Sequence, residues 1–340
     1  MITIKEIAKM AGVSEKTAER ALSGVTKDKR SDARERAERV RKIAREHGYM
    51  PSELALALRR GRSGAVGMVV DILTDQFLAA AVETAVTETA KAGYKITLQI
   101  VRFSPEQTRE AIQTLLASGA EGIITSCTSS QLPQDLINSL VRRNYPLFSL
   151  CERSCFDISS ASPDYSAALP QALQYLVSLG HRKVTLALFK GKERDNERTG
   201  RIFTDSCAKL GIEPDLRIHE NMLQAEQLAN EKIPAVILYG KYSMRRYLDR
   251  CTKLKWQPDI IGIYNEWTAA AAQDFALRGM ILENARTAVI SAVEQIFARI
   301  NGGNVCNLDI PARFVPENEL HQLQLANLAN QYLTDDSSWS

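Results

Sequence analysis

Apolar side chains recur at helical spacing in the first 46 residues, where three short segments each place them on one face. Thr3, with Glu6 three positions later, forms a capping box that predicts the start of the first helix, and Gly12 ends that helix. We expect the second helix to run from Glu15 to Leu22 and the third from about Asp32 to Glu46. Two helices joined by a tight turn and braced by a third are typical of a helix-turn-helix head.

From Ala65 onward, short apolar runs alternate with longer segments of helical spacing. The apolar runs predict strands at 65–70, 95–100, 122–126, 146–150, 184–189, 235–239 and 260–264. The other segments predict helices near 78–92, 105–117, 134–144, 167–179, 199–210, 225–231, 242–254 and 285–300, followed by an extended segment at 308–315. Repeated strand-helix units form parallel sheets with helices on both faces. The sequence therefore predicts an α/β body with two Rossmann-like lobes.

A short segment between the head and the body has its own start and stop signals. Pro51 disfavours helix before it, Ser52 can cap residues 53–58, and Gly61 ends the segment. A helix of about two turns is unstable by itself in water. We therefore expect this segment to order only against a partner.

The charge of the chain is divided unevenly along its length. Residues 1–62 contain 16 Lys and Arg against 9 Asp and Glu, whereas residues 63–340 contain 27 against 31. A small basic module thus precedes a slightly acidic body, which favours a polyanion such as nucleic acid as the partner of the head. Because basic solvated faces are common, charge by itself also fits an ordinary exposed surface.

Several other classes of protein fit the sequence poorly. The six cysteines contain no C-x-x-C pair and the four histidines never stand at metal-ligand spacing, which argues against a zinc site or a disulfide scaffold. No apolar stretch is long enough to span a membrane and no signal peptide is recognisable, so we expect a cytoplasmic protein. No nucleophile elbow or phosphate-binding loop is present. We therefore expect no catalytic residues, no metal and no cofactor.

The head and parts of the body resemble a known family. Residues 3–24, TIKEIAKMAGVSEKTAERALSG, and residues 40–52, VRKIAREHGYMPS, are similar to bacterial transcription regulators of the lactose-repressor/galactose-repressor family. The similarity continues in the body at 120–124, 145–147, 164, 179–183 and 310–315. It implies lobes of the periplasmic-binding-protein type and a regulator, expected to be a repressor, that binds a pseudo-palindromic DNA operator as a homodimer and responds to a small molecule. The alternative is a two-lobed α/β enzyme or ligand-binding protein with an added basic head.

The resemblance assigns the main DNA contacts to the second helix, whose amino end would enter the major groove. Ser14 and Thr17 would contact phosphates, while Glu15, Lys16 and Arg20 would reach base edges, although Glu15 could equally be a solvated charge. The other expected contact residues are Thr3, Ser23, Ser52, Ala55, Leu58 and Arg59. Two positions differ from the family: Glu19 replaces a small hydroxyl residue, and Ser23 replaces asparagine. A carboxylate at position 19 would repel the phosphates unless it pairs with Arg20 or accepts a hydrogen bond from a base.

The linker matches the hinge of the family at Leu58 and Ala55. In family dimers, two hinge helices enter one widened minor groove and insert paired leucines between base steps, which kinks the DNA. The alternative is that the leucines of this segment pack on the body. We favour the wedge because a short segment between Pro51 and Gly61 cannot easily bury itself.

Members of the family bind an effector between the lobes, and the resemblance assigns ligand-binding residues there. These are Asp71, Phe77, Ser126, Cys151, Arg194, Arg198, Lys241 and Asn265. The polar residues usual in the family are replaced here by Cys151, Thr199, Lys241-Tyr242 and Asn265, and the usual glutamine falls on Leu282 or Gln273. The cations Arg153, Arg194, Arg198 and Lys241 would suit a phosphorylated or carboxylate ligand. Alternatively, Glu193, Asp195 and Glu197 neutralise these cations, or the cleft binds no ligand.

These patterns predict the limits of the domains. We expect the head at 1–48, the hinge at 49–63, one lobe at 64–163 plus about 285–307, the other at 164–284 plus about 308–318, and a tail at 319–340. The tail leucines at 320, 323, 325 and 328 are too irregular for a coiled coil. We expect a tail helix that lies on the body and forms no tetramer.

Overall fold

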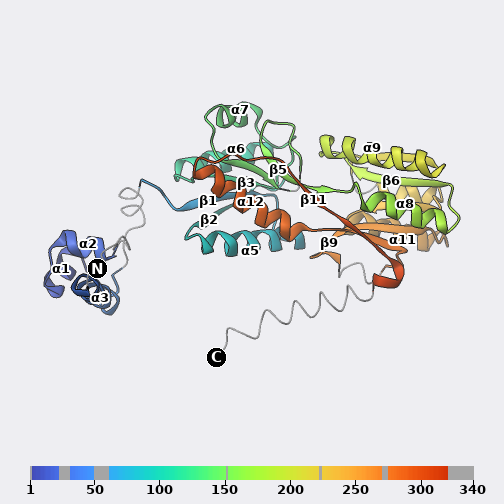
Figure 1. Ribbon diagram of the computed structural model, residues 1–340. Helices are drawn as coiled ribbons and strands as arrows, with labels where there is room; N and C mark the ends of the chain where they lie inside the picture. Colours follow the sequence, from blue (N-terminus) through green and yellow to red (C-terminus); the bar gives the residue numbers. More distant parts are fainter. Residues whose placement is uncertain are drawn as a thin grey trace. The chain divides into compact units, whose positions relative to one another are not determined.

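The computed structural model describes residues 2–22, 31–49, 61–150, 152–221, 224–269 and 275–320. The chain forms two compact units, Met1–Gly64 and Ala65–Ser340 (Figure 1). The expected contacts at Ser23, Ser52, Ala55, Leu58 and Arg59 lie outside the described residues, as do Cys151 and Gln273.

Three helices form the head, as the sequence predicts: α1 (Ile4–Ala11), α2 (Glu15–Leu22) and α3 (Ser31–Glu46). The capping box is present, and Gly12 ends α1 with a φ of 65°, in the left-handed region that favours glycine. The small core of the head contains Ile7, Ala8, Ala11, Ala18, Ala21, Ala37, Val40 and Ala44. Arg41 of α3 donates from Nε to the carbonyl of Ala21 at 3.1 Å, which satisfies an acceptor at the end of α2.

The first lobe of the body contains a six-stranded sheet in the order β11-β5-β4-β3-β1-β2. Its strands are β1 (Ala65–Val70), β2 (Lys95–Ile100), β3 (Ile123–Thr125), β4 (Leu147–Leu150), β5 (Ser159–Asp164) and β11 (Leu308–Pro311). Its helices are α5 (Gln76–Lys91), α6 (Pro105–Ala117), α7 (Gln134–Arg142) and α12 (Ala285–Ile300). Helices α5 and α12 pack on one face, and α6 and α7 on the other.

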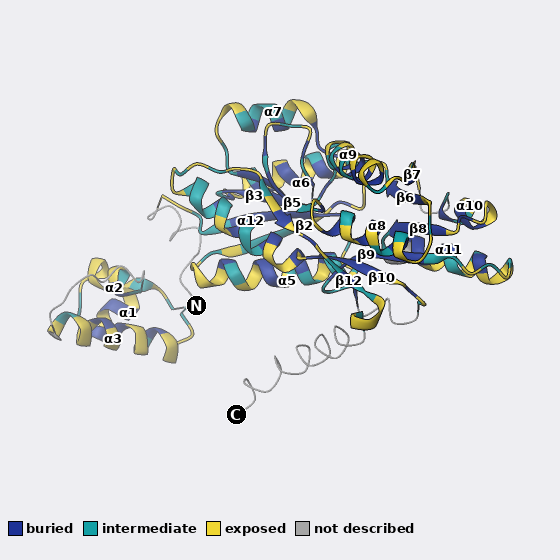
Figure 2. Ribbon diagram, turned by 45° about the vertical axis from the view of Figure 1, so that its right-hand side comes forward, coloured by how far each residue is buried: buried dark blue, intermediate teal, exposed yellow. Residues whose placement is uncertain are grey.

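The second lobe repeats this arrangement with the strand order β12-β10-β9-β8-β6-β7. Its strands are β6 (Lys183–Phe189), β7 (Glu213–His219), β8 (Ala235–Tyr239), β9 (Asp259–Asn265), β10 (Gly279–Glu283) and β12 (Arg313–Pro316). Its helices are α8 (Ala168–Ser178), α9 (Glu193–Leu210), α10 (Ala225–Asn230) and α11 (Lys241–Lys253). Helices α8 and α9 cover one face and α10 and α11 the other, so the central strands are buried (Figure 2).

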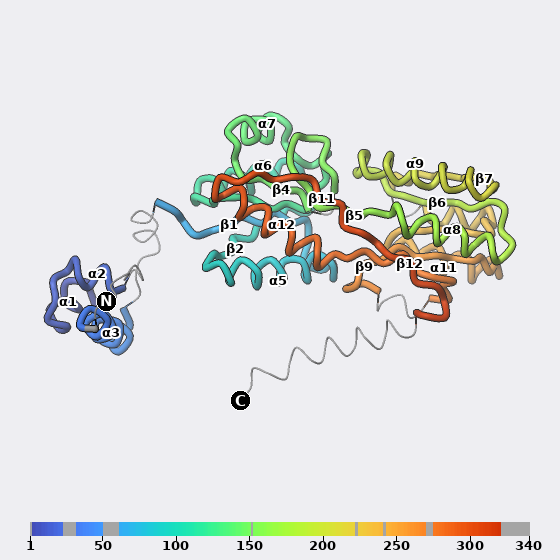
Figure 3. Tube along the Cα trace, in the orientation of Figure 1, coloured from blue at the N-terminus to red at the C-terminus, as the bar shows by residue number. Residues whose placement is uncertain are grey.

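The chain passes between the two sheets after β5, after β10 and after β11. Figure 3 shows the last of these crossings as the red segment that carries β11 and β12. Residues 308–311 belong to the first sheet, where β11 pairs with β5 in parallel. The prediction that residues 308–311 belong to the second lobe is therefore wrong. The chain joins the second sheet only after them, where β12 pairs with β10 in antiparallel orientation.

The sequence does not predict β5, β7 or β10, and it places the start of α9 six residues too late. Strand β5 is rich in serine and contains a proline, and β7 is a charged edge strand, so neither shows an apolar run. No described helix is long and apolar enough to cross a membrane.

Candidate DNA-binding surface and ligand cavity

Helix α2 presents a polar surface at its amino end. Ser14 Oγ accepts from the backbone N–H of Thr17 at 3.2 Å, and the two hydroxyls lie 2.8 Å apart. Glu15, Lys16, Thr17 and Arg20 are exposed, whereas Ala18 and Ala21 are buried in the core of the head. The packing thus directs the side chains that the sequence assigns to DNA outward from one helix.

Thr3 is already hydrogen-bonded within the head. Its backbone N–H and its Oγ1 donate to Glu6 Oε2 at 2.8 and 2.9 Å, and Oγ1 accepts from the N–H of Glu6 at 3.3 Å. The hydrogen bonds from the backbone and the side chain of Thr3 lower the pKa of Glu6. This arrangement fixes the start of α1, which packs against α2.

A cavity of about 700 Å³ lies between the two lobes. Residues from both lobes line it: Asp71, Thr74, Asp75, Gln76, Phe77, Phe103, Thr128, Ser130 and Gln131 from the first, and Phe189, Lys190, Gly191, Glu220, Asn221, Tyr239, Gly240, Ser243, Ile263, Tyr264, Asn265 and Thr268 from the second. Most of these residues follow the carboxyl end of a strand or lie at it. In parallel α/β sheets, this is the edge at which ligands bind.

Asp71 anchors the first-lobe side of the cavity. Its carboxylate is buried and accepts from Gln131 Nε2 at 2.6 Å and from the N–H of Phe103 at 3.2 Å. Burial raises the pKa of Asp71, and these two hydrogen bonds oppose that shift. Arg102 and Phe103 both have positive φ values, 46° and 61°, and the Phe103 ring is exposed beside the cavity.

Asn265 occupies the second-lobe side, at the end of β9. Its Oδ1 accepts from the N–H groups of Trp267 and Thr268, each at 3.1 Å, which shapes the turn after the strand. The ring of Phe77 lies 5.8 Å from that of Trp267, so an aromatic pair also joins the two lobes. Of the sequence-predicted ligand residues, Asp71, Phe77 and Asn265 line the cavity.

Comparison with known proteins matches the head and the body to separate family models. Residues 3–52 match the family described as bacterial regulatory proteins, lacI family, and residues 63–239 match periplasmic binding proteins and sugar binding domain of LacI family. The chain belongs to the LacI family.

Individual LacI-family proteins show how far the likeness extends. The HTH-type transcriptional regulator PtxS of Pseudomonas putida is 28% identical over 203 residues, which are 59% of this chain and 58% of PtxS. The lac repressor dimer bound to operator and the anti-inducer ONPF has a TM-score of 0.77 at 20% identity, over 92% of this chain and 97% of that one. The Cra regulator of Pseudomonas putida in complex with fructose 1-phosphate has a TM-score of 0.62 at 15% identity, over 74% of this chain and 98% of that one. At these identities, the structural likeness shows the fold.

Other ligand residues expected from the family do not meet at the cavity. Ser126, Arg194 and Arg198 are not among the described residues that line it. Arg198 pairs with Asp164 at 2.7 Å and with Asp309 at 2.6 Å, and Arg194 donates to the carbonyl of Cys155 at 3.2 Å. Arg198 therefore links α9 to strands of the first lobe. The alternative from the sequence is that Glu193, Asp195 and Glu197 neutralise the cations of this region, but Arg198 pairs with Asp164 and Asp309.

Two further predicted residues lie next to the cavity. Lys241 begins α11, directly after the lining residue Gly240, and its side chain is outside the described structure. Thr199 lines a smaller adjoining cavity of about 110 Å³ together with Lys192 and Asp195. Asp195 also accepts from the N–H of Arg153 at 2.8 Å.

Sequence reasoning missed several lining residues, including Phe103, Gln131, Lys190, Tyr239 and Tyr264. Each lies near the carboxyl end of a strand or in the segment that follows it. The positions of the predicted strand ends could therefore have identified these residues as candidates to line the cavity. No group of three or more His, Cys, Asp or Glu that could hold a metal occurs among the residues described.

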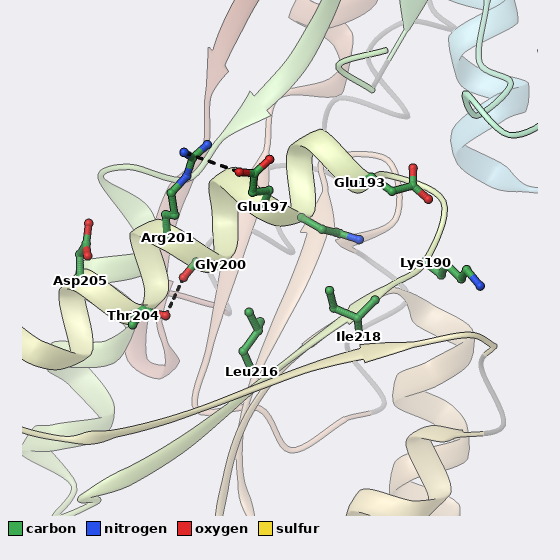
Figure 4. A pocket seen from close by; sticks show the side chains of 10 residues that line it. Lys190, Glu193, Glu197, Gly200, Arg201, Thr204, Asp205, Leu216 and Ile218 are labelled. Carbon is green, nitrogen blue, oxygen red and sulfur yellow. Dashed lines mark hydrogen bonds and ion pairs between the residues drawn. The ribbon is translucent and has the colours of Figure 1, made fainter. Parts of the chain in front are cut away.

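A second cavity, of about 530 Å³, lies between α9 and the edge strand β7 (Figure 4). Leu216 and Ile218 point from β7 toward α9, and Glu197 and Arg201 form an ion pair of 3.7 Å on the helix. Gly200 allows this close approach, because a Cβ there would lie 2.8 Å from Leu216 Cδ2. The predicted ligand residues Asp71, Phe77 and Asn265 belong to the interlobe cavity, which is the better candidate for an effector site.

Proposed function

We propose that this LacI-family chain is a sequence-specific regulator of transcription, expected to be a repressor, that binds a pseudo-palindromic operator as a homodimer. The observation that carries the proposal is the exposed polar end of α2 on a head that precedes a two-lobed body with a cavity. One helix offers few base contacts, so two heads must act together to read a site. Ser14 and Thr17 are proposed to contact phosphates, and Glu15, Lys16 and Arg20 to contact bases.

Substitution of the proposed base contacts tests this reading. Lys16→Ala and Arg20→Ala should each weaken binding to the selected operator by about 1–3 kcal/mol and relax the base preference at one position. Fluorescence anisotropy of the full-length chain on operator and on random duplex would measure both effects. Lys209→Ala removes the same charge from α9 in the other unit and should leave operator affinity unchanged. Equal losses of affinity for operator and for random DNA would indicate instead that the basic head binds DNA without sequence specificity.

The hinge contributes a separate proposal from the sequence. Leu58 and Ala55 are proposed to enter the minor groove, flanked by Ser52 and Arg59 at the phosphates. Leu58→Ala should weaken operator binding while sparing affinity for random DNA, which depends on Lys and Arg. Loss on both duplexes would assign Leu58 to packing of the protein instead.

A small molecule in the interlobe cavity is proposed to set operator affinity. Asp71, Gln131 and Asn265 supply polar groups suited to hydroxyls, and Phe77 supplies an aromatic face. We propose that the molecule also carries an anionic group. Lys190 lines the cavity, and Lys241 directly follows the lining residue Gly240 in the sequence. The structural neighbour Cra is in complex with fructose 1-phosphate, which has such a group. A ligand that touches both lobes can favour one lobe arrangement over another.

Thermal-shift screening of the full-length chain tests the ligand proposal. Sugar phosphates and sugar acids should raise the melting temperature more than their neutral parent sugars, because binding to the native state stabilises it. Lys241→Ala should abolish the effect of the ligand on operator binding and leave the affinity without ligand unchanged. A neutral sugar as the effector, or an intact response in Lys241→Ala, would overturn the anionic assignment.

A further inference from the structure

The edge strand β7 carries apolar side chains at the free edge of the second sheet. It is the last strand in the order of that sheet, and no described strand lies beyond it. Leu216 is 39% exposed and Ile218 is 52% exposed, and both point toward α9 (Figure 4). On the opposite face, Arg217 pairs with Asp215 at 2.9 Å and with Glu231 at 2.7 Å. Because exposed apolar residues on an edge strand favour pairing with another chain, the α9 face of β7 indicates a contact surface.

The backbone of β7 offers hydrogen bonds at the same two residues. The N–H of Glu213 donates to the carbonyl of Arg182 at 2.8 Å, and the carbonyl of His219 accepts from the N–H of Lys190 at 2.8 Å. Residues 213 and 219 therefore direct their backbone groups toward β6 and its flanks. Successive residues of a strand direct these groups alternately to the two sides. The N–H and C=O groups of Leu216 and Ile218 thus face the free edge, where an added strand would pair with them.

Helix α9 forms the other wall of the groove of about 530 Å³ beside this edge. Its lining residues include Glu193, Glu197, Arg201 and Asp205, which recur every four positions. Residues at this spacing lie on one face of a helix, so the groove follows the length of α9 and of β7. A groove of this form suits an extended segment that lies along β7 and directs every second side chain toward α9.

The charges of the groove favour a basic segment. Four carboxylates stand against two cations among the charged lining residues and Glu220, an ion-pair partner of one of them: Glu193, Glu197, Asp205 and Glu220 against Lys190 and Arg201. Both cations are paired, Arg201 with Glu197 at 3.7 Å and Lys190 with Glu220 at 3.2 Å. The carboxylates of Glu193 and Asp205 form no ion pair with the described residues. They lie 12 residues apart on α9, a distance of about 18 Å along the helix axis.

We propose that β7 and α9 bind an extended segment of a partner protein, which adds a strand beside β7. Its apolar residues alternate, and a Lys or Arg stands at each end opposite Glu193 and Asp205. Because an extended chain rises about 3.3 Å per residue, cations six residues apart on one face match the separation of these carboxylates. The tail of this chain does not fit this description, since residues 321–340 contain no Lys or Arg and two Asp.

This inference goes beyond the proposed binding of an operator and a small molecule. Among the described residues, the groove and the interlobe cavity share only Lys190. The main-chain hydrogen bonds of the added strand would supply affinity, and its alternate side chains would supply specificity. A partner protein could therefore bind the second lobe while the interlobe cavity stays accessible.

A designed peptide tests the groove. The sequence KTVTVTK places two lysines six residues apart and two valines between them on the same face. Fluorescence polarisation of the labelled peptide with the full-length chain would measure binding, and hydrogen exchange would report on the backbone of residues 213–219. We expect saturable binding, protection of the outward N–H groups of Leu216 and Ile218, and about tenfold weaker binding of ETVTVTE, whose ends repel Glu193 and Asp205.

Two variants and a matched control assign this binding to the groove. Ile218→Lys should weaken KTVTVTK about tenfold, because it removes an apolar contact and adds a like charge. Asp205→Lys should weaken KTVTVTK and strengthen ETVTVTE, a reversal that misfolding cannot produce. Leu179→Lys changes a residue that is 42% exposed at the end of α8 in the same lobe, and it should bind both peptides like the unmodified chain.

Other results would overturn the inference. These are no binding of KTVTVTK, equal binding of the two peptides, or unchanged binding by Ile218→Lys. A smaller assembly of Ile218→Lys in sedimentation would assign the surface to a second copy of this chain, and stronger peptide binding after deletion of residues 321–340 would assign it to the tail. Operator affinity, measured on the same samples, should be equal in all variants, so failure of the peptide would leave the proposed function standing.

Discussion

Gly262 and Tyr264 illustrate how one small residue fixes a side chain of the cavity. Gly262→Ala would place a methyl group 2.3 Å from a ring atom of Tyr264, and this ring is too buried to move freely. We expect a loss of about 1–3 kcal/mol in the free energy of unfolding, measured by urea titration. In a Tyr264→Ala background the same substitution should cost much less. Equal costs in both backgrounds would show that the ring is not the obstacle.

Glu6 makes the start of α1 sensitive to pH. Its pKa is lowered in the folded head by hydrogen bonds from Thr3, so its contribution to stability is present above the ordinary glutamate pKa and is lost as pH falls through the lowered value. The protection factors of the α1 amides in the full chain, which are corrected for the intrinsic pH dependence of hydrogen exchange, should therefore fall at acid pH. Glu6→Gln retains a capping partner that does not titrate and should remove this fall in protection. An unchanged pH profile in Glu6→Gln would assign the effect to another group.

At the scale of elements, apolar runs predict the central strands, and amphipathic spacing predicts α1, α2 and α12. The missed start of α9 has a physical reason: its buried residues there are Asn196, Thr199 and Gly200, which show no apolar stripe. The helix is held instead by polar contacts, such as Asn196 Nδ2 with the carbonyl of Phe189 at 2.7 Å. Sequence periodicity cannot predict an element that packs in this way.

Arg198 should stabilise the contact between α9 and the first lobe. It pairs with Asp164 and Asp309; the side chains of Arg198 and Asp164 are partly buried, whereas that of Asp309 is exposed. Arg198→Met would leave Asp164 without this cation, and we expect a loss of about 1–2 kcal/mol in urea unfolding of the full chain. Arg201→Met is the matched control, because Arg201 pairs with Glu197 on the exposed side of the same helix. Similar losses in the two variants would contradict a special role for Arg198.

At the scale of the whole molecule, the candidate site is assembled from distant parts of the chain. Asp71, Phe77 and Asn265 are predictable because each matches a family position at or after a strand end. The role of Arg198 cannot be predicted from the sequence, because its partner Asp309 is 111 residues away along the chain. Asp309 lies near Arg198 only because β11 pairs with β5 in the first sheet. Tyr264 lies in an apolar run, and its unpartnered hydroxyl is visible only once the packing is known.

The tail allows a test of assembly. Leu320 packs against the core of the second lobe, and the following leucines are too irregular for a coiled coil. Deletion of residues 319–340 should leave a dimer in analytical ultracentrifugation, as in the full chain. A change from tetramer to dimer would show that the tail holds two dimers together.

The central claim is that two heads of one dimer read a single DNA site. Selection of sites from a random oligonucleotide pool by the full-length chain, followed by sedimentation of the complex, measures this most directly. We expect one pseudo-palindromic sequence bound by two copies of the chain, with much weaker binding to unrelated duplex at the same salt concentration. Enrichment of no sequence, or one copy of the chain bound per selected site, would contradict the account.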